Sequence, residues 1–332
     1  TPCGTLFPYT TLFRSVIKDR QRVSAGRPAV FNGCRLERIS PTMPELPEVE
    51  TVVRKLRPHV VGRQIQTVEL LWQRMVDRPD PQTFASHLTG ARVISIGRRG
   101  KFICFNLDTG QTWLVHLRMT GKFFICPVDS GECYILESAR HWNIDHVRAR
   151  FFLESGLGLV YVDMRKFGRF YLVDDPQEIV GALGPEPLGD AFTVAWLTQA
   201  LQGRTGEIKR LLLNQHFLAG LGNIYVSEAL WRARIHPQRR AGSLTEEESA
   251  RLHAAIVSSL RAGLSNGGTS LDDRQYVYPD GGLGDHQSKL VVYDRAGEQC
   301  PRCGYEVQRM VQGQRSTYFC PICPSVPADK RK

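Results

Sequence analysis

The stretch Met43–Thr51, which reads MPELPEVET, decides how the rest of the chain is interpreted. Pro47 suits the first turn of a helix, where a missing N–H costs nothing, and the glutamates around it suit the positive end of a helix. Apolar residues then recur at helical spacing and predict one buried face. These residues are Val49, Val52, Val53 and Leu56. The stretch therefore predicts the start of an amphipathic helix.

Pro44 gives the same stretch a chemical interpretation. If translation begins at Met43 and that residue is removed, Pro44 carries a free secondary amine. Such an amine attacks an electrophilic carbon and forms an iminium, which is nucleophilic catalysis. With residues 1–42 attached, the same nitrogen is a tertiary amide and is no nucleophile. The activity expected of the chain therefore depends on its N-terminus.

The 332-residue chain has the composition of a globular protein of about two domains. No apolar run approaches the roughly 18 residues that a membrane span needs, so no membrane partner is expected. The formal charge is +10, and residues 1–42 hold seven of the basic and two of the acidic side chains. The remaining +5 favours a polyanionic partner if the basic groups gather on one face.

Residues 1–42 do not read as part of the fold, because they show no sustained periodicity. Their Arg-rich, acid-poor composition allows a transit peptide. The favoured interpretation is a translated stretch of non-native sequence that precedes Met43. In either case we expect the folded protein to begin at Met43.

Four of the nine cysteines form two close pairs near the C-terminus. The spacing CxxC, sixteen residues, CxxC predicts a tetrahedral four-thiolate zinc site on a β-hairpin. Four protein ligands close the site, so one Zn²⁺ ion with a structural role is expected. The ligands are Cys300, Cys303, Cys320 and Cys323. The other five cysteines show no framework spacing, which favours unpaired thiols in a reducing compartment.

The chain between these motifs predicts an α+β multidomain protein. Short apolar runs and tight turns over residues 63–173 predict an antiparallel β-sandwich, and helical patterns follow the Gly- and Pro-rich stretch 184–189. Thr245 and Glu248 have the spacing of a capping box. The expected parts are an extension (1–42), a catalytic β-sandwich domain with flanking helices (43–178), a linker (179–191), a helical domain (192–289), a zinc-ribbon hairpin (290–324) and a basic tail (325–332).

From residue 43 to about 323, the chain resembles the formamidopyrimidine-DNA glycosylases, which remove oxidised purines from DNA. Five motifs occur in the family's order, and the Gly that follows the first Glu in the endonuclease VIII branch is absent. The resemblance implies a bifunctional DNA glycosylase and AP lyase without catalytic metal or redox cofactor. Pro44 would attack C1′ of the sugar, Glu45 would act as proton donor, and β,δ-elimination would follow. Residues 192–289 would form a helix–two-turn–helix domain with a lesion-capping loop at 266–289.

The resemblance also implies how phosphates are held. Lys101, counted with the catalytic residues, and Asn223 would grip the DNA backbone, and Arg315 on the zinc hairpin would reach the phosphate at the lesion. The glycines of the 219–225 stretch would let backbone N–H groups approach a phosphate. Lys209 would lie near the damaged base.

Further residues have implied roles inside the duplex and around the site. Met119, Arg165 and Phe167 would enter the base stack when the nucleotide is turned out, with Arg165 facing the unpaired base. Glu48 and Glu228 would be supporting acids. The 266–289 segment lacks an aromatic residue just after its Gly, so the resemblance leaves the exact lesion preference open.

We therefore expect a monomer in the bacterial cytoplasm that acts on damaged double-stranded DNA. Two alternatives belong to other functional classes. If Pro44 stays blocked by residues 1–42, the chain would be a catalytically inactive protein that binds lesions or DNA. A zinc-ribbon nucleic-acid adaptor is the second alternative, but it explains neither the first helix nor the two stack-entering loops.

Overall fold

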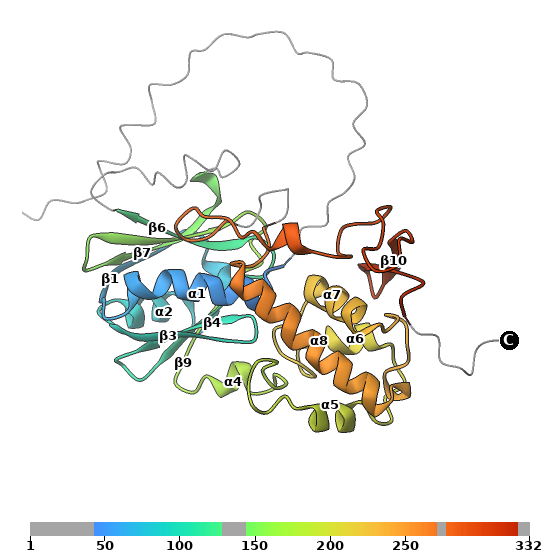
Figure 1. Ribbon diagram of the computed structural model, residues 1–332. Coiled ribbons are helices and arrows are strands. Elements are labelled where there is room, and N and C mark those ends of the chain that lie inside the picture. The colour runs from blue at the N-terminus through green and yellow to red at the C-terminus, as the bar shows by residue number, and fades with distance from the viewer. Residues whose placement is uncertain (1–42, 128–143, 271–276, 325–332) are drawn as a thin grey trace, which may run out of the picture.

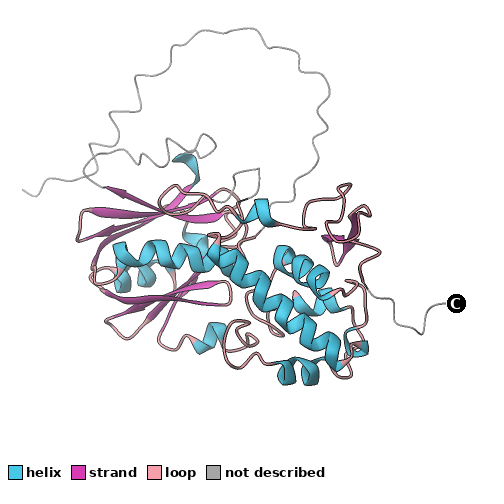
Figure 2. Ribbon diagram, viewed as in Figure 1, coloured by secondary structure: helices cyan, strands magenta, loops and turns pink. Residues whose placement is uncertain are grey.

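The computed structural model describes residues 43–127, 144–270 and 277–324. Two β-sheets stand at one end of the molecule, and a group of helices with a C-terminal β-hairpin stands at the other (Figure 1). The distribution of helices and strands in Figure 2 confirms the α+β fold class with an N-terminal sandwich. The predictions for the extension (1–42) and the basic tail (325–332) lie outside the described residues. The boundaries given above for the domains stay a prediction.

The sandwich is built from a four-stranded sheet in the order β1-β7-β8-β6 and a five-stranded sheet in the order β2-β9-β5-β4-β3. Its strands are β1 (Ile65–Leu70), β2 (Val76–Arg78), β3 (Val93–Arg99), β4 (Phe102–Leu107), β5 (Thr112–His116), β6 (Gly121–Pro127), β7 (Val147–Leu153), β8 (Leu157–Asp163) and β9 (Arg169–Val173). All pairs are antiparallel except β2 with β9, which are parallel. The antiparallel prediction therefore fails at that one sheet edge.

Helix α1 (Leu46–Val60) lies between the two sheets in Figure 1 and supplies part of their shared core. The four apolar residues predicted to face inward are buried, as expected from their spacing. Aromatic rings fill much of the remaining space, with Trp113 of β5 stacked on Phe105 and in contact with Phe151. Helix α2 (Pro81–Leu88), capped by Asp80, closes one side. Packing in this core fixes the direction of α1, so that its N-terminal turn points toward the helical part of the protein.

The helical part contains α4 (Gln177–Val180), α5 (Val194–Leu201), α6 (Ile208–Leu212), α7 (Asn223–Ala233) and α8 (Glu246–Ser265). Short 3₁₀ turns lie at Gln73–Met75, Ile144–His146, Ala241–Ser243 and His286–Lys289. The predicted capping box is confirmed, because Thr245 Oγ1 accepts from the Glu248 amide and the Glu248 carboxylate accepts from the Thr245 amide. Helices α7 and α8 pack together around one core that also takes in Leu46 of α1.

The C-terminal hairpin consists of β10 (Gln308–Gln312) and β11 (Arg315–Phe319). Gly313 and Gln314 between them both have φ near +60°, as the tight turn of a two-residue hairpin requires. Glu228 of α7, 2% exposed, fixes the chain that leads into this module. Its carboxylate accepts from the amides of Val291, Val292 and Tyr293 at 2.9–3.0 Å. One buried side chain therefore anchors the zinc hairpin to α7.

The segment predicted to cap the lesion, residues 266–289, packs against the rest of the protein at its described residues. Val277 and Tyr278 are buried, Asp280 pairs with Lys55 of α1, and the Pro279 carbonyl accepts from the amide of Ile125. The segment is thus attached to the four-stranded sheet and to α1.

None of the helices in the described ranges is long and apolar enough to cross a membrane. Cys126 is disulfide-bonded. The expectation of unpaired thiols outside the two CxxC pairs is therefore wrong at Cys126.

Candidate active site and DNA-binding surface

Glu45 lies where the sandwich meets the helices, directly after Pro44, and both residues are buried. Its carboxylate accepts hydrogen bonds from the amides of Ile224 at 2.8 Å and Tyr225 at 3.3 Å, in the first turn of α7. Free N–H groups and the helix dipole favour an anion at that position. Burial raises the pKa of Glu45 to about 7, although Lys101 and the two amides oppose the rise. The carboxyl group can therefore carry a proton at neutral pH.

The glycines before α7 make room for this contact. A Cβ on Gly222 would lie 2.3 Å from Cδ of Glu45, and one on Gly220 would lie 2.9 Å from Leu46. Gly220 also accepts the amide of Leu46 with its carbonyl at 3.0 Å. The prediction that this loop offers its N–H groups to a phosphate is therefore wrong for the first turn of α7. The anion held there is the protein's own Glu45.

Glu48 ties the same corner together and is 3% exposed. It accepts from the Glu45 amide at 3.0 Å, the Tyr225 hydroxyl at 2.8 Å and the Thr269 amide at 2.7 Å. Burial raises the pKa of Glu48, and these donors oppose the rise. Glu48 thus joins α1, α7 and the segment that follows α8, which fits the supporting role expected of it.

Lys101 is 3% exposed and is one of the charges that Glu45 senses. Burial lowers its pKa, while Glu45 opposes this change. The neighbouring arginines of the predicted basic turn are already paired, since Arg98 and Arg99 both bond the carboxylate of Glu186. Of Arg98, Arg99 and Lys101, only Lys101 acts on the Glu45 carboxyl group.

Three predicted DNA-binding residues meet at the zinc hairpin. The backbone carbonyl of Ser316 accepts from Lys209 Nζ at 3.1 Å and from Asn223 Nδ2 at 2.8 Å. Its neighbour Arg315 is exposed and acts electrostatically on both Lys101 and Lys209. Burial lowers the pKa of Lys209 to about 7, and its ammonium also bonds the hydroxyl of Thr317. Lys209 and Asn223 therefore hold the hairpin that presents Arg315.

His116, which ends β5 near Lys101, was not among the predicted site residues. It is buried, and its Nδ1 accepts from the amide of Arg118 at 3.0 Å. Burial lowers its pKa to about 3, with Arg118 and Lys101 adding to the effect, so the imidazole is neutral. A histidine that ends a buried strand directly before the Met119 loop was the available signal.

The structure brings together, on two adjacent loops, the three residues that were predicted to enter the base stack. The guanidinium of Arg165 lies 4.6 Å from the ring centroid of Phe167, and its Nη1 lies 3.1 Å from Sδ of Met119. Phe167 is 46% exposed, a large apolar ring left in solvent. The three side chains thus form one wedge made of Met119, Arg165 and Phe167, in which Arg165 and Phe167 are exposed and Met119 is half-buried.

A buried carboxylate supports this wedge from below. Asp163 is 1% exposed and accepts from the Thr120 hydroxyl and, at 2.8 Å, from the Gly168 amide. Thr120 in turn accepts the amide of Arg165 at 3.1 Å. Asp163 therefore connects the two loops that carry the wedge.

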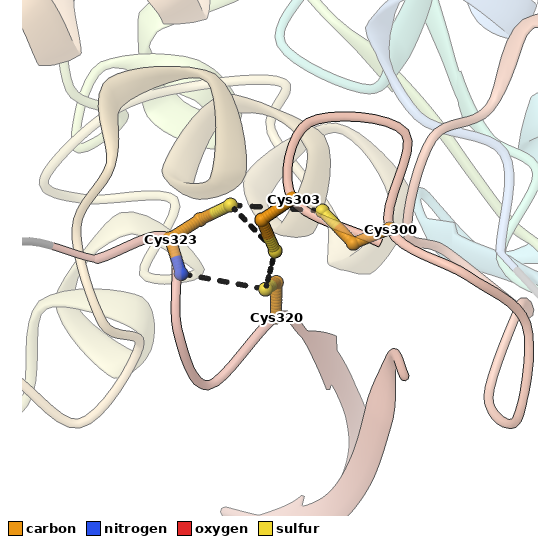
Figure 3. A group of neighbouring side chains, drawn as sticks. All are labelled: Cys300, Cys303, Cys320 and Cys323. Atoms are coloured by element: carbon orange, nitrogen blue, oxygen red, sulfur yellow. Dashed lines mark hydrogen bonds between the residues drawn. The ribbon is translucent and has the colours of Figure 1, made fainter. Parts of the chain in front are cut away.

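The four cysteines of the two CxxC pairs converge (Figure 3), with their sulfurs within 4.8 Å of one another. Cys300 Sγ lies 3.6 Å from Cys323 Sγ, and Cys303 Sγ lies 3.5 Å from Cys320 Sγ. A tetrahedral zinc with Zn–S bonds of about 2.3 Å needs sulfurs roughly 3.8 Å apart. The cluster fits one structural Zn²⁺, and this confirms the predicted cofactor.

The geometry defines a class of protein, a DNA glycosylase that joins a sandwich to a zinc-bearing helical domain. Family models agree, matching a formamidopyrimidine-DNA glycosylase N-terminal domain at 43–170, an H2TH domain of the same enzyme at 183–275, and a zinc finger found in FPG and IleRS at 297–325. Formamidopyrimidine-DNA glycosylase from Chloroflexus aurantiacus is 45% identical over 85% of this chain and 97% of its own length. The enzyme of that name from Symbiobacterium thermophilum is 45% identical over 86% and 90%.

Solved structures give the same result. The MutM (Fpg) protein of Thermus thermophilus has a TM-score of 0.74 at 40% identity, covering 84% of this chain and 98% of its own. Lactococcus lactis Fpg, in a complex with DNA that contains an abasic site, has a TM-score of 0.76 at 35% identity, covering 85% and 100%. The chain belongs to the formamidopyrimidine-DNA glycosylase family. It is a DNA glycosylase with AP lyase activity, and DNA is its partner.

Substituting Gly222→Ala tests the contact between Glu45 and α7. The backbone there has φ −140°, which any residue adopts, so the effect is the collision of the new Cβ with the Glu45 carboxyl. We expect single-turnover excision to fall about 100-fold, since a displacement near 1 Å costs on that order. Binding to undamaged duplex should change little.

Gly206→Ala is the matched control, because nothing lies within 4 Å of a Cβ at that position. It should excise at the wild-type rate. Wild-type excision by Gly222→Ala would contradict the role given to this contact.

Proposed function

We propose that this chain removes oxidised purines, 8-oxoguanine and formamidopyrimidines among them, with the Pro44 amine as nucleophile and Glu45 as proton carrier. The observation that carries the proposal is the buried Glu45 carboxyl, with a pKa near 7, directly beside Pro44. A general acid works best when its pKa lies near the working pH. The family match that begins at Met43 supports Pro44 as the N-terminal residue of the active enzyme.

The reaction then divides between these two residues. The Pro44 nitrogen attacks C1′, the C1′–base bond breaks, and the amine proton passes to the departing base. Glu45 then gives its proton to the ring oxygen, the C1′–O bond of the ring breaks, and an iminium joins the protein to the open sugar. The iminium acidifies the C2′ proton, and β- followed by δ-elimination cuts the strand on both sides of the sugar. The alternative of a binding protein without catalysis requires that Pro44 remain acylated, and the full-length relatives do not favour it.

The cations around Glu45 are suited to hold the phosphates. Among the described residues Lys101 has no hydrogen-bond partner for its ammonium, so a phosphate oxygen can complete its contacts. Arg315 is exposed on a hairpin whose carbonyl is fixed by two donors, and its planar fork matches a phosphate. The carbonyl contact of Asn223 supports the hairpin, and its second role would be in the phosphate grip.

The wedge explains how the vacancy left by an everted nucleotide is filled. Met119 and Phe167 would replace the lost stacking, and Arg165 would face the unpaired base, usually cytosine. Since each of these contacts needs an intact double helix, the substrate is damaged duplex DNA. We further propose that the protein acts as a monomer in the bacterial cytoplasm.

Borohydride trapping tests the amine chemistry. The chain expressed from Met43, incubated with an 8-oxoguanine:cytosine duplex, should give a covalent protein–DNA adduct. The 332-residue chain should give none, because its Pro44 nitrogen is an amide. Mass spectrometry of the N-terminus verifies that Met43 has been removed. A chain with confirmed N-terminal Pro44 and bound zinc that forms no adduct would sink the lyase mechanism for this lesion.

Thr120→Val tests the support of the wedge. The change is nearly isosteric, but it removes the hydroxyl that links Asp163 to the amide of Arg165. We expect the ratio of excision rates opposite cytosine and opposite adenine to fall about 5-fold, as losing one buried hydrogen bond costs about 1 kcal/mol.

Thr198→Val is its control, because the Thr198 hydroxyl is buried without a hydrogen-bond partner in the described part of the chain. That variant should keep the wild-type ratio. The same ratio in Thr120→Val would show that the loops need no such link.

A further inference from the structure

The zinc module makes a contact with α7 that its four cysteines do not explain. The indole Nε1 of Trp231, near the end of α7, donates to Sγ of Cys300 at 3.3 Å. Cys300 is 1% exposed, so water does not compete for its sulfur. A hydrogen bond in such surroundings is stronger than one in water.

Arg302, between the first two cysteines, fixes the indole from its other side. Its guanidinium lies 3.9 Å from the centroid of the Trp231 ring, and its Nη1 donates to the Trp231 carbonyl at 2.9 Å. These contacts involve no metal ligand atom. The direction of the indole N–H toward the Cys300 sulfur is therefore set by the protein around it.

Charge explains what such a donor does for a zinc site. Four thiolates on a divalent ion leave an excess of negative charge on the sulfurs, and an N–H aimed at one sulfur stabilises that charge. Groups outside the ligand shell also hold each ligand in the direction that the metal needs. Their loss typically costs about 10–100-fold in metal affinity.

We propose that Trp231 is a positioning residue of the zinc site, whose indole N–H holds the Cys300 sulfur toward the ion and slows the loss of zinc. The contact joins metal retention to α7, the helix whose first turn holds Glu45. The proposal is independent of the reaction mechanism, because it concerns only the metal and its neighbours.

The test compares Trp231→Phe with Trp196→Phe in the zinc-loaded full chain. Phenylalanine keeps an aromatic ring beneath Arg302 but lacks the N–H. Trp196 lies on α5 and contacts the rings of Phe192 and Phe217, away from the metal site. With excess chelator, we expect Trp231→Phe to release zinc about ten-fold faster than the wild type, and Trp196→Phe to match the wild type.

Cobalt in place of zinc separates the hydrogen bond from packing. Loss of the N–H leaves a more electron-rich sulfur, so the sulfur-to-cobalt charge-transfer band of Trp231→Phe should move to lower energy. Wild-type release with an unmoved band would overturn the proposal. Faster release with an unmoved band would overturn it too, because the effect would then come from packing alone.

If Trp231→Phe fails to fold, the hydrogen bond can still be tested in the wild-type protein. In the cadmium-loaded chain, the Trp231 indole proton should show a magnetic coupling to the metal through the hydrogen bond and the sulfur. A coupling supports the assignment, and its absence overturns it.

Discussion

The rest of the site depends on one interaction, the buried carboxylate of Glu45 at the N-terminus of α7. It joins two residues that lie about 180 positions apart, and it closes the sandwich onto the helical domain. Taking a carboxylate out of water costs several kcal/mol, and helix N–H groups return about 2 kcal/mol at most. The balance leaves a carboxyl group that protonates near neutral pH. The same contact thus joins the two domains and gives the proposed proton carrier a pKa near neutrality.

Helix α7 makes further contacts along its length that hold the site together. Its first turn holds Glu45, Asn223 at its start braces the hairpin carbonyl of Ser316, and Glu228 one turn later anchors the chain that enters the zinc module. Trp231 near its end reaches a zinc-ligating sulfur. The zinc site and the corner around Glu45 are therefore both attached to a single helix.

Patterns among residues close together in the sequence were sufficient to predict much of the fold. The buried face of α1, the capping box at Thr245 and the cysteine pairs all depend on short spacings, and the structure bears them out. The parallel pairing of β2 with β9 was missed because it joins segments far apart in the chain. The glycines before α7 were predicted to bind a phosphate. That prediction failed for the same reason, because the carboxylate that occupies the start of the helix belongs to Glu45, far away in the sequence. The local sequence indicates that the N-terminus of a helix favours an anion, but it does not show which anionic group binds there.

Titration of the Glu45 carboxyl tests the central claim most directly. In the folded full chain with carbon-13 in its glutamate carboxyls, the signal that disappears in Glu45→Gln identifies this group. The account predicts a midpoint near pH 7, because burial outweighs the α7 amides and Lys101. A midpoint near the ordinary value of 4.5 would contradict it, since Glu45 would then be a solvated or fully compensated carboxylate with no proton to give at neutral pH.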